Sequence, residues 1–74
     1  MNNRLDLHGT KHVDVQQKLD QFYWQMIQRG HYEVEVVTGI SESMKNIVKE
    51  VSKDYNFKVE EVPLNPGSLT IRIK

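Results

Sequence analysis

The chain of 74 residues carries ten basic and ten acidic side chains, for a formal net charge of +0, and it has no cysteine. The balanced charge excludes a surface that is basic throughout, so nucleic-acid binding would require a local arrangement of charge. The lack of cysteine excludes disulfides and thiolate metal sites and suits a cytoplasmic location. No apolar stretch approaches the ~20 residues that span a bilayer, so we expect no membrane partner. The length predicts a single domain over residues 1–74.

The first two elements follow from a change of hydrophobic period. Residues 4–8 alternate, which predicts a strand with Leu5 and Leu7 on one face and Asp6 and His8 on the other. Gly9 and Thr10 break that pattern. Residues 13–29 predict an amphipathic helix that stops at Gly30. Its expected apolar stripe consists of Val15, Leu19, Phe22, Tyr23, Met26 and Ile27.

The rest of the sequence predicts a strand, a helix and two further strands. Residues 33–38 predict a second strand, and Ser41 is placed to cap a second helix that ends at Asn56. The apolar stripe of that helix consists of Met44, Ile47, Val48 and Val51. Residues 57–62 predict a third strand. The stretch "PLNPG" at 63–67 is expected to be irregular, and "SLTIRIK" at 68–74 to form the last strand.

The predicted order is therefore β-α-β-α-β-β. Connections through helices favour parallel pairing, and the short last connection favours an antiparallel final strand. The strands alternate rather than forming continuous apolar runs, so only one face of the sheet is expected to be buried. We predict an α/β fold of the α+β two-layer sandwich kind, a mixed four-stranded sheet with both helices on one face. The polar residues expected on the open face or its rim are Asp6, His8, Glu33, Glu35, Lys58, Thr70, Arg72 and Lys74.

Three turns are expected to meet at one end of this fold. The first two strands end at residues 8–9 and 38–39, and an antiparallel last strand would begin beside them, near residues 65–67. Ligands of open α/β sheets bind outside the carboxyl ends of parallel strands. Both helices would also begin at this end, where their free N–H groups favour anions and glycines allow phosphate to approach the backbone.

These stretches resemble a known family. "LDLHG" at residues 5–9, "VVTGIS" at 36–41 and "NPGSLTI" at 65–71 are similar to the three signature stretches of the Smr (small MutS-related) domain. The resemblance implies a fold similar to the C-terminal domain of bacterial translation initiation factor three. It also implies nucleic-acid binding and, for several members, nicking or cleavage of DNA or RNA. The family's cleavage-linked stretch maps to Asp6 and His8.

The candidate site residues combine the geometry with the resemblance. Asp6 and His8 are candidates for catalysis, because an imidazole exchanges protons near neutral pH and a carboxylate could orient it, act directly or hold a metal. The candidates for nucleic-acid binding are Gly9, Lys11, Thr38, Gly39, Ser41, Lys45, Asn65 and Gly67. No dedicated metal cage is expected, and a loosely held Mg²⁺ or Mn²⁺ shared with phosphate is left open.

Each candidate has a plainer interpretation. Asp6 and His8 are also compatible with solvated side chains, and Asn65 with turn chemistry alone. Lys45, Lys49 and Lys53 share one helix face, which is either solvated or follows a phosphate backbone. Trp24 lies off the apolar stripe and is expected to be partly buried, the alternative being a contact with a partner or a base.

The sequence departs from the family pattern at one turn. Ser41 stands where the family usually has a second glycine, and Ile40 stands where a basic residue is common. Three functions therefore remain open: an endonuclease, which we favour, a module of the same fold that binds nucleic acid without cutting it, and a protein-interaction adaptor. Ser41 and the zero net charge favour the second.

Overall fold

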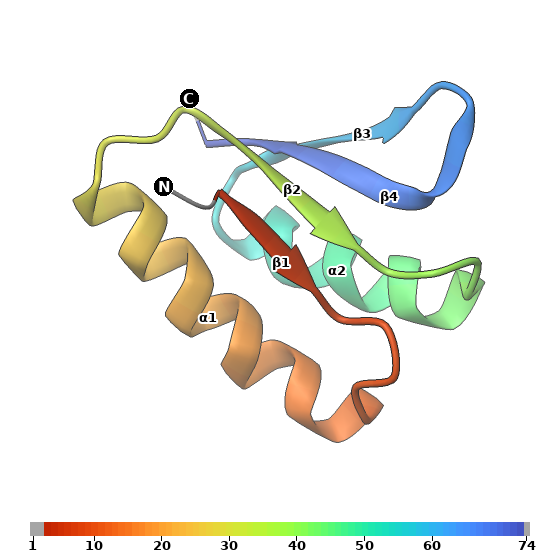
Figure 1. Ribbon diagram of the computed structural model, residues 1–74. Coiled ribbons are helices and arrows are strands. Elements are labelled where there is room, and N and C mark those ends of the chain that lie inside the picture. The colour runs from red at the N-terminus through yellow and green to blue at the C-terminus, as the bar shows by residue number, and fades with distance from the viewer. Residues whose placement is uncertain (1–2, 74) are drawn as a thin grey trace.

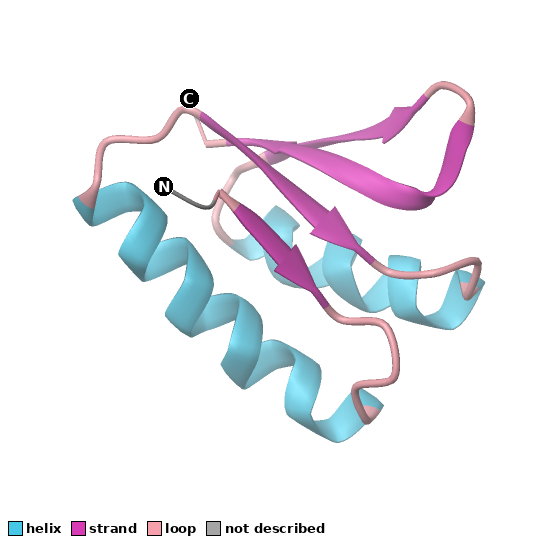
Figure 2. Ribbon diagram, in the orientation of Figure 1, coloured by secondary structure: helices cyan, strands magenta, loops and turns pink. Residues whose placement is uncertain are grey.

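Strands and helices alternate along residues 3–73, which are the residues that the computed structural model describes. The elements in chain order are β1 (Arg4–Asp6), α1 (His12–Gln28), β2 (Glu33–Val37), α2 (Glu42–Asp54), β3 (Lys58–Val62) and β4 (Asn65–Arg72). The four strands form one sheet in the order β1-β2-β4-β3. Both helices cover the same face of this sheet, and the other face carries no helix (Figure 1, Figure 2). The predicted two-layer α+β arrangement is confirmed.

The strand directions decide which loops meet. β1 pairs with β2 in parallel, and β4 lies antiparallel between β2 and β3. The carboxyl ends of β1 and β2 and the start of β4 therefore share one edge of the sheet. Each helix runs back against the strand before it, so α1 and α2 both begin at that edge (Figure 1). The sequence prediction of a common edge is confirmed.

The core lies between the sheet and the two helices. Its buried apolar residues are Leu7, Val15, Leu19, Phe22, Tyr23, Met26, Val34, Val36, Met44, Val48, Val51, Leu69 and Ile71. The predicted stripes of both helices are thus confirmed, apart from Ile27, which is 44% exposed. The expectation of partial burial for Trp24 is wrong, because this side chain is 64% exposed. The two residues lie three positions apart on α1.

A tyrosine from α1 links the two helices inside the core. The hydroxyl of Tyr23 lies 2.6 Å from Oγ of Ser52 on α2, and both side chains are fully buried. The Tyr23 ring packs edge-on against Tyr55 and Phe57. Burial raises the pKa of Tyr23 to about 12. The Tyr55 hydroxyl donates to Asp20 of α1 at 2.6 Å, and this hydrogen bond raises the pKa of Tyr55 to about 12. These contacts fix the spacing of the two helices.

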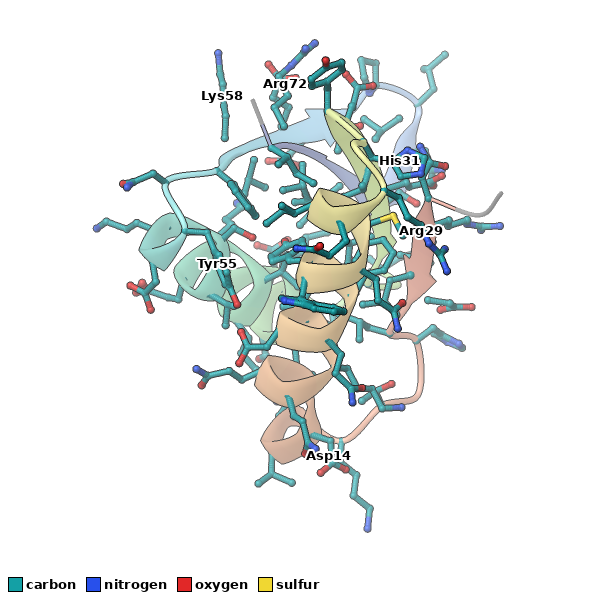
Figure 3. The ribbon with its side chains drawn as sticks, turned by 90° about the vertical axis from the view of Figure 1, so that its left-hand side faces the viewer. Asp14, Arg29, His31, Tyr55, Lys58 and Arg72 are labelled. Atoms are coloured by element: carbon teal, nitrogen blue, oxygen red, sulfur yellow. The ribbon has the colours of Figure 1, made fainter. Side chains whose placement is uncertain are left out.

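The open face carries ion pairs that cross the strands. Arg72 of β4 contacts Glu60 of β3 at 2.9 Å and Glu33 of β2 at 3.3 Å, and Arg4 of β1 contacts Glu35 at 3.8 Å. The Arg72 hydrogen bond holds the pKa of Glu60 below its usual range. Figure 3 shows Arg72 and Lys58 projecting from the side of the sheet away from the helices. The expected polar face is confirmed, while Lys74, also expected there, lies outside the described residues.

Several element boundaries differ from the predictions. β1 ends at Asp6 instead of residue 8, although the N–H of Leu7 still donates to the carbonyl of Val37 at 2.7 Å. The expectation that 63–67 is irregular throughout is wrong, because β4 begins at Asn65, which pairs with Val62. Asn56 was expected to end α2. The helix ends at Asp54, and Asn56 has a left-handed φ of 62° in the turn beyond it.

The buried hydroxyl pair gives a test of the core. Tyr23→Phe leaves the buried Ser52 hydroxyl without this partner and should lower the free energy of unfolding by about 1–3 kcal/mol. Adding Ser52→Ala to Tyr23→Phe should cost less than the sum of the two single substitutions, because the unpaired hydroxyl is removed. Urea denaturation of the four proteins measures this. Strictly additive effects would contradict the pairing.

Candidate functional site

The first loop of the shared edge is a tight turn after β1. The N–H of Thr10 donates to the carbonyl of Leu7 at 2.9 Å, which closes a four-residue turn over residues 7–10. Gly9 has a φ of +81° at the third position, where this conformation favours glycine. Leu7 is fully buried, whereas His8 is exposed. The turn therefore anchors one side chain in the core and presents the imidazole to solvent.

Asp6 holds this turn through the backbone. Its Oδ1 accepts a hydrogen bond from the N–H of His8 at 2.9 Å. The carboxylate thus fixes the position of the His8 backbone, and no hydrogen bond joins it to the imidazole ring among the contacts of residues 3–73. Of the roles that the sequence leaves open for Asp6, the structure shows an orienting contact, made to the main chain of His8.

The second loop lies against the first. Thr38 is buried, and its hydroxyl donates to the carbonyl of Gly39 at 2.8 Å. Gly39 has a φ of +69°, and a Cβ built there would lie 3.0 Å from Cδ2 of His8. The imidazole ring therefore lies over Gly39, and a side chain at this position would have a strained positive φ and a tight contact with His8.

The third loop is hydrogen-bonded to the second. The carbonyl of Gly67 accepts from the N–H groups of Thr38 and Gly39, at 2.8 and 3.1 Å. Oδ1 of Asn65 accepts from the N–H of Gly67 at 3.3 Å, and its Nδ2 lies 3.4 Å from Oγ of Ser68. A Cβ on Gly67 would lie 3.6 Å from Cα of Gly39 and 3.7 Å from Oδ1 of Asn65. The three loops thus form one continuous surface, here called the loop rim: residues 6–9, 38–41 and 65–67.

The start of α2 borders the loop rim. Oγ of Ser41 accepts from the N–H of Met44 at 3.1 Å, so the predicted cap is confirmed. Lys45 is only 4% exposed, and its Nζ lies 3.9 Å from the carboxylate of Glu42. The solvated interpretation is therefore wrong for Lys45, and this candidate for phosphate contact is buried beside Glu42 in the first turn of α2. Further along α2, Lys49 and Lys53 are exposed as expected.

The start of α1 lies at the same edge as the start of α2. Lys11 is exposed at the N-cap position, and its side chain makes no capping hydrogen bond. Its carbonyl accepts from the N–H of Asp14 at 2.9 Å. Figure 3 shows Asp14 at this lower end of the helix, far from Arg29 and His31 at the other end. Lys11 thus places a positive charge near the loop rim, at the start of α1.

The one carboxylate of the loop rim, Asp6, and its one imidazole, His8, do not form a metal cage. Among residues 3–73, no three His, Asp or Glu side chains gather closely enough to hold an ion together. One oxygen of Asp6 is already hydrogen-bonded to the main chain. A Mg²⁺ or Mn²⁺ ion at this place would therefore need ligands from a bound phosphate.

Two features of the rim escape the sequence patterns. Ser68 is buried beneath Asn65 and supports its amide, although its position in the sequence suggests only a strand start. Leu64 has a left-handed φ of 66° and is fully exposed at the tip of the β3–β4 hairpin. The signal for this turn is Pro63, because proline at the first central position of a turn commonly precedes a residue with positive φ.

Comparison with known proteins places the chain in a family. The model of the Smr domain family matches residues 5–63, which is most of the chain, so the chain belongs to the Smr domain family. That match contains the first two loops of the rim and ends before the third. A search of curated proteins finds no match.

A solved structure agrees with this assignment. The solution structure of the SMR domain of NEDD4-binding protein 2 matches with a TM-score of 0.78 and 22% sequence identity. The match covers 100% of this chain and 88% of that one, so it includes the third loop. At this identity the likeness shows the fold. No helix within residues 3–73 is long and apolar enough to cross a bilayer.

The two facing glycines give a matched pair of substitutions. Gly39→Ala should lower the free energy of unfolding by roughly 1–3 kcal/mol, because the residue has a positive φ and its methyl would press on His8. Gly67→Ala meets only ordinary contacts and should change stability by less than about 0.5 kcal/mol. Chemical denaturation compares them. Equal stability of the two variants would contradict the described packing of the loops.

Proposed function

We propose that this chain is a single Smr domain that binds nucleic acid at the loop rim and cuts a phosphodiester bond there. The observation that carries the proposal is the convergence at one edge of the sheet. An exposed imidazole covers Gly39, Gly39 faces Gly67, and both helices begin beside them. The chain's membership of the Smr family supports it. A chain without cysteine suits a cytoplasmic setting for this activity.

The loop rim suits a phosphate group more than a neutral ligand. The first-turn N–H groups of a helix carry the positive end of its dipole, and the α1 start has no side-chain cap to satisfy them. Gly9 leaves the backbone uncovered, because nothing lies within 4 Å of the place where its side chain would stand, and Gly67 has only ordinary contacts there. Lys11 adds a cation at the same edge. This arrangement compensates for a net charge of zero by concentrating donors at one place.

His8 is the residue best placed to act on the phosphodiester. Water attacks the phosphorus atom and the bond to one ester oxygen breaks, which leaves a phosphate monoester and a hydroxyl group. His8 either takes the proton of the attacking water or donates one to the departing oxygen. Asp6 is a positioning residue in this scheme, because its hydrogen bond holds the backbone of His8. No step depends on a bound metal.

A module that binds without cutting is the second candidate. Asp6 is bonded to the main chain, and no carboxylate is hydrogen-bonded to the imidazole among residues 3–73, so no carboxylate orients the His8 ring. Ser41, which replaces a family glycine, uses its hydroxyl to cap α2. The adaptor alternative relies on Trp24, whose exposed ring lies on α1, or on an exposed edge strand of the sheet.

A cleavage assay on supercoiled plasmid and structured RNA, with and without Mn²⁺, tests catalysis. His8→Ala should reduce the cutting rate by about 10²- to 10⁴-fold. Asp6→Asn should cut nearly as well as the wild type, because its amide oxygen can accept the same N–H of His8. Asp6→Ala removes that acceptor and should cut more slowly. Gel analysis of the nicked product gives the rates.

The remaining outcomes separate the candidates. Equal cutting by His8→Ala and wild type would reject His8 as the catalytic group. If no protein cuts but the wild type binds the probes and Gly67→Ala binds more weakly, the chain is a binding module. Gly67→Ala serves here as a variant that keeps the fold but covers the backbone at the rim. If the wild type binds neither probe, the adaptor reading replaces both.

A further inference from the structure

The tip of the β3–β4 hairpin contains one residue, Leu64, that is unusual in both its exposure and its backbone conformation. Leu64 is a large aliphatic side chain with a relative exposure of 104%, so it contributes nothing to the core. It also has a φ of 66°, in the left-handed region that disfavours residues with a branched or bulky side chain. Stability alone would favour a small or polar residue at this place.

The turn itself explains the conformation but not the residue. Pro63 and Leu64 connect the paired residues Val62 and Asn65, so they are the two central residues of the turn. Proline fixes a negative φ at the first of these positions, and a positive φ at the second is that of a type II turn. Glycine or asparagine is the usual residue at that second position. A leucine there has an unfavourable positive φ, and its apolar side chain is also exposed to solvent.

A second exposed aliphatic side chain lies at the same edge. Ile40 is 79% exposed and directly follows Gly39 in the β2–α2 loop. The β4 strand joins the two places, because Leu64 lies three residues before Gly67 and the Gly67 carbonyl accepts from the N–H of Gly39. Leu64 and Ile40 are therefore each connected to the glycine contact of the loop rim by a short stretch of chain, Leu64 through the start of β4 and Ile40 directly after Gly39.

We infer that Leu64 inserts between the bases of a locally unpaired step of the nucleic acid whose backbone lies on the loop rim, with Ile40 as a second apolar contact at that rim. This inference rests on the proposed function and names the feature of the substrate that the rim would recognise. Aliphatic wedges are known to enter base steps and unstack them, and an unpaired base makes that cheaper. The exposed leucine gains on binding the burial that it lacks in the free protein.

The surroundings of Leu64 favour a base step over a protein surface. The exposed apolar residues at the tip are only Pro63, Leu64 and Pro66, next to the polar Asn65. A stable protein interface buries about 800 Å² on each partner, with an apolar centre of several residues. A base step needs a single projecting side chain next to a place that holds the backbone, and this is the arrangement at the rim.

The test uses the full chain and two DNA duplexes of one sequence, one fully paired and one with a single unpaired base beside a 2-aminopurine. Wild type should bind the bulged duplex about fivefold more tightly than the paired one. It should also raise the 2-aminopurine fluorescence, because that base becomes unstacked. Leu64→Asn should lose both effects and raise the urea midpoint, since asparagine tolerates the positive φ. Leu64→Met should keep the preference.

Control variants and outcomes complete the design. Ile40→Asn should reduce the preference, whereas Ile27→Asn, at the far end of α1, should leave it unchanged. If Leu64→Asn prefers the bulged duplex as strongly as wild type, the inference fails while nucleic-acid binding stands. If the wild type binds neither duplex nor any RNA, the proposed function and the inference fail together. A raised midpoint with an unchanged preference would make Leu64 a strained residue without this role.

Discussion

The carbonyl of Gly67 accepts two hydrogen bonds from the backbone of the neighbouring loop, and the arrangement of the candidate site depends on them. They tie Thr38 and Gly39 to the start of β4, although Gly39 and Gly67 lie 28 positions apart in the sequence (67 − 39). The contact is close because neither glycine has a side chain. His8 then lies on Gly39 and closes the surface from the third side. A single main-chain oxygen thus joins the loops that carry the polar groups.

The rest of the fold holds these loops in place and leaves them uncovered. Insertion of β4 between β2 and β3 brings its first residues to the edge where β1 and β2 end. The aromatic contacts of Tyr23 fix α1 and α2 below the sheet, so that both begin at this edge. On the face of the sheet that carries no helix, Arg72 forms ion pairs with Glu33 and Glu60. The loop rim is therefore the place where backbone donors, an imidazole and exposed aliphatic groups occur together.

Most of the fold could be predicted because it depends on local patterns. Alternation gave the strands, the period of 3.6 gave the helices, and Ser41 marked a cap that the structure contains. The burial of Lys45 could not be read in this way, because the long stem of a lysine packs on apolar neighbours that the sequence does not identify. The sequence also did not predict that β4 begins at Asn65, since Pro66 and Gly67 are poor strand residues. Pairing of Asn65 with Val62 and hydrogen bonds from Thr38 and Gly39 to Gly67 hold this stretch in place.

The candidate site was predictable in position and less so in its internal contacts. The order of the elements and the expected antiparallel direction of the last strand placed residues 8, 39 and 67 at one edge, and the sheet topology agrees. The hydrogen bond from the N–H of His8 to the carboxylate of Asp6 depends on the four-residue turn after β1. This bond supports a positioning role for Asp6 and not a direct part in the reaction. Leu64 is a residue that the sequence does not mark as unusual, because only its φ and its exposure in the structure distinguish it.

The most direct measurement of the central claim is an NMR titration of the amide groups with a short DNA duplex at low and high salt. The account predicts that the amides of His8, Gly9, Gly39 and Gly67 shift together, and that the affinity falls as salt rises because phosphates are being neutralised. Amides at the far end of α1, near Arg29, should stay unchanged. Shifts confined to the far end of α1 or to the open face of the sheet, or an affinity that ignores salt, would contradict a phosphate-binding surface at the loop rim.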